Sequence, residues 1–161
     1  MKKFVLASVA ALALATPSYA AEFSGARIGA TAGFVDDDFA GTSTFTYGVN
    51  AGYDFDLGKT VAGATVEWQG SDEDALSRDL AVTGRFGVKA GDKALVYALA
   101  GYTNLGVDTP GDNVHLDGAR VGAGVELAFS PRFYGQVEYR YSNYELDVDG
   151  HQMLVGLGVR F

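Results

Sequence analysis

Residues 116–142 carry the sequence LDGARVGAGVELAFSPRFYGQVEYRYS, and this stretch decides the fold. Apolar residues alternate with glycine or polar residues on both sides of the central Ser130-Pro131 pair. Because successive side chains of a β-strand point to opposite faces, a period of two is typical of a strand. The stretch therefore predicts two antiparallel strands, 116–129 and 132–142, joined by a tight turn.

The same alternation continues in both directions along the chain. Eight segments show it, and the last of them ends on Phe161. Segment 94–103 is apolar on both faces, so its register stays open. The predicted strands are residues 23–34, 44–55, 60–69, 78–90, 94–103, 116–129, 132–142 and 151–161.

The links between these segments alternate in length. Residues 56–59, 91–93 and 130–131 form short turns, whereas 35–43, 70–77, 104–115 and 143–150 form longer, acidic links. Outer-membrane barrels have short periplasmic turns and longer extracellular loops. The pattern predicts an all-β protein, an eight-stranded antiparallel up-and-down transmembrane β-barrel, with no helix after residue 20.

One face of the segments is apolar and rich in aromatic residues, and we expect it to meet lipid. Aromatic residues gather near the segment ends, as in the aromatic girdles of membrane barrels. A soluble, lipocalin-like barrel is the alternative, but four arginines would then be buried in an apolar core. The predicted lipid-interface aromatics are Phe34, Tyr53, Phe55, Trp68, Phe129, Phe133, Tyr139 and Tyr141.

The other face combines glycine with charged residues, and we expect it to fill the interior. Eight strands leave an interior just wide enough to be filled by side chains. Buried charges must be paired, so the sequence predicts a lumen charge network that plugs the barrel. Its predicted members are Arg27, Asp54, Glu67, Arg85, Arg120, Glu126, Glu138, Arg140 and Arg160, with Lys89 on the same face.

The N-terminal residues predict an export signal that is cleaved. Lys2 and Lys3 precede an apolar run at 4–15, and Ser18-Tyr19-Ala20 matches the small-x-small cleavage pattern. The run is shorter than the ~20 residues of a spanning helix. The predicted organisation is a signal peptide at 1–20 and a barrel domain at 21–161.

Charge and composition exclude some classes of function. Without Lys2 and Lys3, ten of the 12 basic residues remain against 20 acidic ones, a net charge of −10. Nucleic-acid binding, which requires a basic face, is therefore not expected. The chain has no cysteine, and nothing in the sequence predicts a cofactor or a bound metal.

The chain resembles the small eight-stranded outer-membrane barrels of the OmpA, OmpX and opacity types. The resemblance rests on 117–145, with its glycine-rich strand and a strand ending Glu138-Tyr139-Arg140-Tyr141, and on the closing GLGVRF of 156–161. It implies the outer membrane of a Gram-negative bacterium, with lipid and lipopolysaccharide as surroundings. It also implies that the barrel-assembly machinery reads Phe161 as an assembly signal.

Members of this family differ in function, so three classes remain open. We expect a structural barrel with a role in envelope integrity or surface interaction, and a narrow passive channel is the alternative. A lipid A-modifying enzyme is less expected: His115 and His151, with Ser142 and Glu145 near the second, are the candidate residues, and no nucleophile signature is present. A large-solute porin is excluded, because it needs 16–18 strands.

Acidic runs in the longer links offer an extracellular ligand site, but they are expected to be solvated. They are residues 36–38 and 72–74, and DVDG at 147–150, which resembles only the start of a calcium loop. The sequence assigns no metal site to them.

Overall fold

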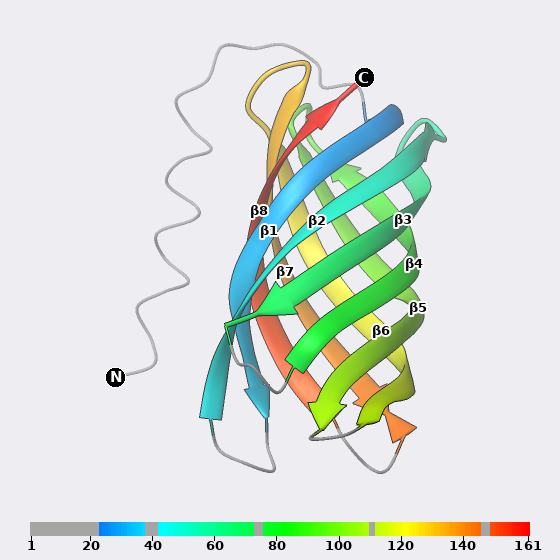
Figure 1. Ribbon diagram of the computed structural model, residues 1–161. Coiled ribbons are helices and arrows are strands. Elements are labelled where there is room, and N and C mark those ends of the chain that lie inside the picture. Colours follow the sequence, from blue (N-terminus) through cyan, green and yellow to red (C-terminus); the bar gives the residue numbers. More distant parts are fainter. Residues whose placement is uncertain (1–22, 38–41, 73–75, 110–111, 146–148) are drawn as a thin grey trace.

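Figure 1 shows the computed structural model, which describes residues 23–37, 42–72, 76–109, 112–145 and 149–161. Eight antiparallel strands follow one another around a closed barrel, and β8 pairs with β1. This confirms the predicted all-β up-and-down barrel. The strands are β1 (Gly25–Asp37), β2 (Thr42–Asp56), β3 (Thr60–Ser71), β4 (Leu76–Ala90), β5 (Ala94–Thr109), β6 (Asp112–Ala128), β7 (Phe133–Tyr144) and β8 (Asp149–Arg160).

The predicted signal peptide, residues 1–20, lies outside the described residues. Among the residues that are described, no helix is long and apolar enough to span a bilayer.

The strands are longer than the alternation predicts, and they lengthen at one end of the barrel. β5 continues to Thr109, and β6 begins at Asp112. The links are thus reduced to 38–41, 72–75, 110–111 and 145–148, so the prediction of long loops is wrong. Backbone pairing continues after the apolar alternation has stopped. We call the end of the barrel where the strands lengthen the acidic end, at the bottom of Figure 1, and the opposite end the short-turn end.

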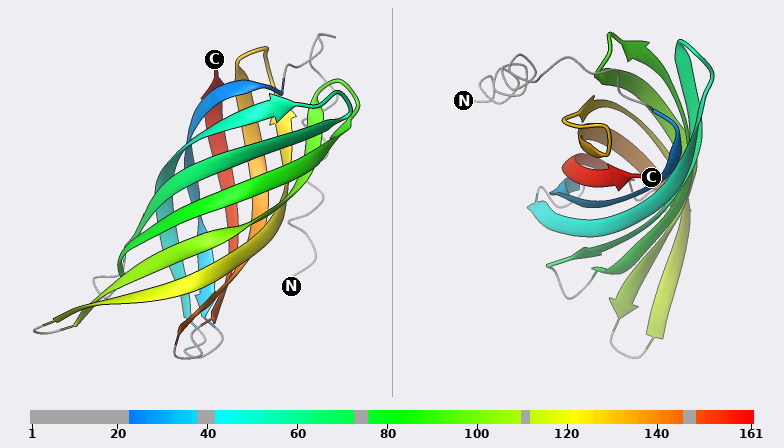
Figure 2. Two further views of the ribbon diagram at one scale, coloured as in Figure 1. Left: turned by 90° about the vertical axis from the view of Figure 1, so that its right-hand side faces the viewer. Right: turned by 90° about the horizontal axis from the view of Figure 1, so that it is seen from above.

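The β5–β6 hairpin extends furthest at the acidic end. Its pairing continues to Thr109↔Asp112, whereas β6 pairs with β7 only from Gly118↔Tyr144 onward. β4 follows β5 only to Leu76↔Val107. The hairpin therefore projects beyond its neighbours, as the left view of Figure 2 shows.

Tight backbone geometry closes the short-turn end. Gly58 has φ 91°, and its amide donates to the Asp56 carboxylate at 2.8 Å. Gly25, with φ 103°, allows β1 to approach the chain end, since a Cβ there would lie 2.2 Å from the Phe161 carbonyl oxygen. The Phe161 amide donates to the Ala26 carbonyl at 2.8 Å, which continues the β1–β8 ladder to the last residue.

Side chains alternate between the interior and the outer face in every strand. The structure also decides the register of β5, which the sequence left open. Leu95, Tyr97 and Leu99 are buried inside, whereas Val96 and Tyr102 are half exposed on the outer face. The barrel therefore has a mostly polar interior and an apolar exterior, the reverse of a soluble β-protein.

Candidate functional site

The outer face carries the predicted interface aromatics in two bands. Tyr53, Phe55, Phe129 and Phe133 lie near the short-turn end, and Phe34, Trp68, Tyr139 and Tyr141 lie towards the acidic end. All but Tyr141 are at least 40% exposed, and Tyr141 packs its ring 5.0 Å from that of His151. Phe45, Tyr47, Phe86 and Tyr102 extend the same face.

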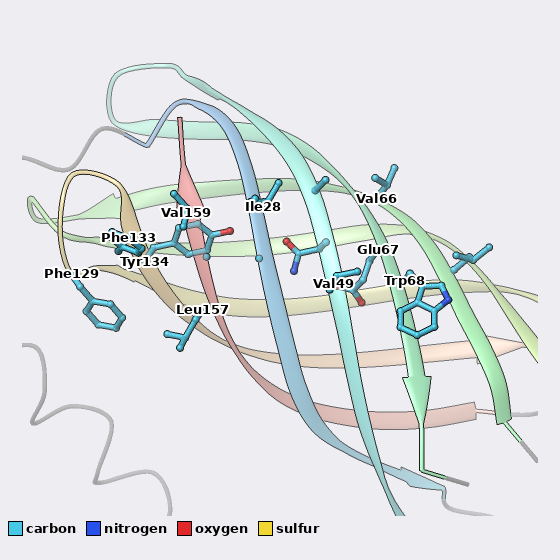
Figure 3. A pocket seen from close by; sticks show the side chains of 15 residues that line it. Ile28, Val49, Val66, Glu67, Trp68, Phe129, Phe133, Tyr134, Leu157 and Val159 are labelled. Carbon is cyan, nitrogen blue, oxygen red and sulfur yellow. The ribbon is translucent and has the colours of Figure 1, made fainter. Parts of the chain in front are cut away.

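An apolar hollow of about 830 Å³ lies on this face (Figure 3). Ile28, Val49 and Val66 line it with exposed side chains. Its polar lining residues Asn50 and Glu67 have side chains buried on the interior side of the wall. A specific ligand needs polar groups that fix its orientation, so this hollow is part of the general apolar surface.

The interior holds the charged residues in layers, and the first layer lies towards the short-turn end. Asp54, fully buried, accepts from Arg85 Nε at 2.9 Å and from Arg160 Nη2 at 2.9 Å. Arg27 Nε lies 3.1 Å from the same carboxylate. Glu126, also fully buried, accepts from Arg85 and Arg160 at 2.9 Å each. Three arginines thus surround two carboxylates.

The second layer joins opposite sides of the barrel. Arg140 Nη2 donates to Glu67 at 2.8 Å, and its Nε donates to Glu138 at 2.6 Å. Tyr97 also donates to Glu138, at 2.6 Å. One arginine is therefore held between two carboxylates, with a tyrosine hydroxyl completing the set.

The third layer contains an acid that the sequence analysis missed. Asp79 of β4 is buried and accepts hydrogen bonds from Arg120 and Thr103. Arg120 also donates to Ser142 at 2.9 Å and to the Tyr144 hydroxyl at 3.1 Å. Asp79 could have been found, because it shares the odd-numbered face of Arg85 within the same segment.

Asp79 changes the charge count of the interior. Five arginines and five carboxylates are buried among the described residues, so the two signs are equal. Lys89, expected on the inner face, instead lies at the short-turn mouth in an ion pair with Asp56. The buried charges are Arg27, Arg85, Arg120, Arg140, Arg160, Asp54, Glu67, Asp79, Glu126 and Glu138.

Glycines opposite the large side chains make room for the network. Gly63 pairs with Asp54 across β2 and β3, and a Cβ on Gly63 would lie 2.1 Å from an Asp54 carboxylate oxygen. A Cβ on Gly158 would lie 2.3 Å from the ring of Tyr134, over which the Arg160 guanidinium lies at 5.4 Å. The glycine-rich inner face is thus a packing requirement of a narrow, charged interior.

Phe23 closes the interior at the short-turn end. It precedes β1, is fully buried, and packs in a cluster with Val61 and Leu95. The guanidinium of Arg160 lies 5.5 Å from the ring centroid, and the Lys89 ammonium lies 5.9 Å from it. The alternation predicts Phe23 as the first residue of a strand, and nothing in the sequence indicates that it closes the interior.

A small cavity lies between the first and second layers. A polar cavity of about 10 Å³ lies among Arg27, Glu67, Arg85 and Glu138. A buried water needs roughly 10–15 Å³, so this cavity has room for about one. The arrangement holds charges in place, and this cavity is too small for a solute.

The structure separates the candidate enzymatic residues. Ser142 is buried inside and accepts a hydrogen bond from Arg120, whereas His151 lies on the outer face, with Nδ1 2.5 Å from the Tyr139 hydroxyl. His115, expected in a loop, is an exposed residue of β6, and Glu145 is exposed beyond β7. No serine–histidine pair is assembled from these residues.

The acidic runs fall largely at the strand ends. Asp36 lies in β1 and accepts from Ser43 at 3.2 Å, and Asp149 begins β8 and accepts from Tyr141 at 3.1 Å. Residues 38, 73, 74 and 147 lie outside the described residues. Within the described part of the chain, no three carboxylates or histidines are grouped closely enough to hold a metal ion.

Comparisons with known proteins point to membrane barrels. A family model described as an outer membrane protein beta-barrel domain matches residues 4–161. The N-terminal β-barrel domain of Pseudomonas aeruginosa OprF has a TM-score of 0.65 at 15% identity, covering 86% of this chain and 99% of that one. No curated protein sequence matches.

Two further solved structures share the fold. The attachment invasion locus protein Ail of Yersinia pestis, in complex with the heparin analogue sucrose octasulfate, has a TM-score of 0.62 at 18% identity, covering 86% and 97% of the two chains. The outer membrane enzyme PagL has a TM-score of 0.59 at 15% identity, covering 84% and 99%. Identities this low show the fold alone.

Proposed function

The chain belongs to the outer membrane protein beta-barrel domain family, and from this premise we propose that it is a structural, surface-interacting barrel with a closed lumen. The family implies the outer membrane of a Gram-negative bacterium. The observation that carries the proposal is that, in the part of the chain that the structure describes, five buried arginines are matched by five buried carboxylates. Breaking such pairs is costly, so the side chains that fill the lumen are held there.

The closed lumen is tested by ion conductance. We expect the refolded wild-type barrel to give no steady single-channel steps in planar bilayers, because paired side chains fill its interior. Glu67→Ala combined with Arg140→Ala removes both partners of one cross-lumen pair and keeps the charge balance. This double variant removes side-chain volume from the second layer and serves as the control with an opened lumen. Reproducible steps from the wild type would favour the narrow channel instead.

The envelope role is tested in a deletion strain. We expect the strain to become several-fold more sensitive to detergent and to take up more of an apolar dye, because a rigid barrel is lost from the outer membrane. Complementation should use the wild-type chain and, separately, the Glu67→Ala/Arg140→Ala variant. A deletion strain that behaves like its parent would contradict envelope integrity and leave the surface-interaction role.

The proposal assigns no turnover to this chain. Ser142 and His151 lie on opposite faces of the wall, so a serine nucleophile paired with histidine cannot form between them. The lipid A-modifying activity suggested by the sequence thus finds no support in these residues. We also propose that Phe161, 73% exposed at the end of the β1–β8 ladder, presents the assembly signal to the barrel-assembly machinery.

Lipid and an extracellular ligand are the proposed partners. Exposed acids at the acidic end include Asp36, Asp72, Asp117 and Glu145. The Ail structure holds a heparin analogue, which is a polyanion. A rim of carboxylates repels polyanions, so we propose that an extracellular ligand of this barrel is cationic or is bound through bridging divalent cations.

A further inference from the structure

We propose that Arg78, Gly106 and His115 form a binding site for the phosphate headgroup of an outer-leaflet lipid. The inference deepens the proposed function and rests on it in one respect, the exposure of the acidic end to the outer leaflet. Of the ten cationic side chains among the described residues, five are buried in the interior, and Lys59, Lys89, Lys93 and Arg132 lie at the short-turn end. Arg78 is the tenth.

The three residues form one row across adjacent strands. Arg78 of β4 pairs with Gly106 of β5, which pairs with His115 of β6. Arg78 and His115 are exposed, and both belong to the outward-facing set of their strands. Two strand spacings, about 10 Å, separate their backbones.

Gly106, which has no side chain, leaves room for the side chain of Arg78. A Cβ at Gly106 would lie 3.2 Å from Arg78 Cγ and 3.7 Å from its Nε, so the arginine side chain lies over the glycine. It thus extends from β4 over β5, the strand that separates it from His115 of β6. A guanidinium is planar and presents paired donors that match phosphate oxygens, and an imidazole adds a further donor.

The height of the row along the barrel suits a headgroup. Leu80 and Val82, next along β4, are exposed apolar residues, and Tyr102 is half exposed beside them. Arg78 lies two residues beyond Leu80, about 6–7 Å further towards the acidic end. A lipid whose phosphate meets Arg78 can therefore lay its acyl chains along Leu80 and Val82.

The neighbouring carboxylate of Asp117 has hydrogen-bond donors on one of its two oxygens. Oδ1 accepts from the Tyr102 hydroxyl and from Asn104 Nδ2, the latter at 2.7 Å. Both donors lie on the side of the aromatic band. Arg78 is the one arginine or lysine among the described residues of this rim, so a phosphate binds most favourably beside it.

The test is native mass spectrometry of the refolded barrel titrated with a dilauroyl lipid that carries a phosphate monoester headgroup. We expect Arg78→Gln to weaken the one-to-one adduct about tenfold, as for the loss of one charge-assisted contact. Gly106→Val should weaken it similarly by displacing Arg78 without changing the charge. Arg132→Gln is the matched control, since it removes an exposed charge at the opposite end and should bind like the wild type.

Three results would overturn the inference. Equal weakening by Arg78→Gln and Arg132→Gln would indicate general charge attraction rather than a site. Equal adducts with a zwitterionic lipid of the same chain length would show no phosphate monoester preference. Displacement of the lipid by equimolar inorganic phosphate would assign the site to a soluble anion. Because Arg78 is exposed and takes no part in the buried charge network, any of these results would leave the closed, structural barrel standing.

Discussion

Asp54→Ala is expected to lower the free energy of unfolding by about 3–5 kcal/mol, the range for removing one partner of a buried ion pair. Asp54 is fully buried and is contacted by three arginines, Arg27, Arg85 and Arg160. Without it, Glu126 remains as the acid of that layer, and the interior holds one more positive charge than negative. Equilibrium urea titration in lipid vesicles measures the loss, followed by the fluorescence of Trp68, the single tryptophan.

Asp56→Ala is the matched control for this experiment. Asp56 is only two residues further along the same strand, and its ion pair with Lys89 is partly exposed at the mouth. Exposed pairs contribute little, so the change should stay within about 1 kcal/mol. If the two variants unfolded at the same urea concentration, the buried layer would not be a determinant of stability.

Phe23→Ala is expected to cost a similar amount, about 3–5 kcal/mol, for a different reason. The ring is fully buried against Val61 and Leu95, so truncation removes apolar burial and leaves a cavity. It also removes the aromatic face beneath the Arg160 guanidinium. The same urea titration measures the stability, and planar-bilayer recording shows whether loss of the plug admits ions.

Phe23→Leu separates packing from the aromatic contact. It keeps most of the apolar volume, so a loss of less than about 1.5 kcal/mol is expected if packing dominates. A loss equal to that of Phe23→Ala would assign the stabilisation to the ring itself. Wild-type stability of both variants would mean that Phe23 does not plug the barrel in the membrane.

In the interior of this barrel, substitution is limited by glycines that face large polar or charged side chains. Gly63 faces Asp54 with no room for a side chain, and a Cβ on Gly124 would lie 2.7 Å from Glu138 Cγ and 2.8 Å from the Tyr97 ring. These large side chains of the interior therefore occupy the space left by a glycine on the neighbouring strand. A change on either side of such a pair must be compensated on the other.

The alternation of the sequence is enough to predict the strand number, the up-and-down order and which face of seven of the eight segments is apolar. It could do so because a period of two is a local property of the chain, and both faces differ clearly in polarity. In β5 both faces are apolar, so the alternation does not show whether Leu95 or Val96 points into the lumen. The hydrogen bond from Tyr97 to Glu138 places the odd-numbered residues of β5 inside. Strand ends were also missed, because apolar alternation follows the lipid-facing band, whereas backbone pairing continues to Thr109 and Asp112.

Which charges meet in the lumen follows from the closed barrel and not from the alternation. Arg140 binds Glu67, 73 positions away, because closing the barrel brings β3 and β7 to opposite sides of one narrow lumen. The same closure brings Asp79 to Arg120 and Phe23 to Arg160. Periodicity gives a residue its face, but the partner across the lumen depends on strand register and tilt, which are properties of the closed sheet.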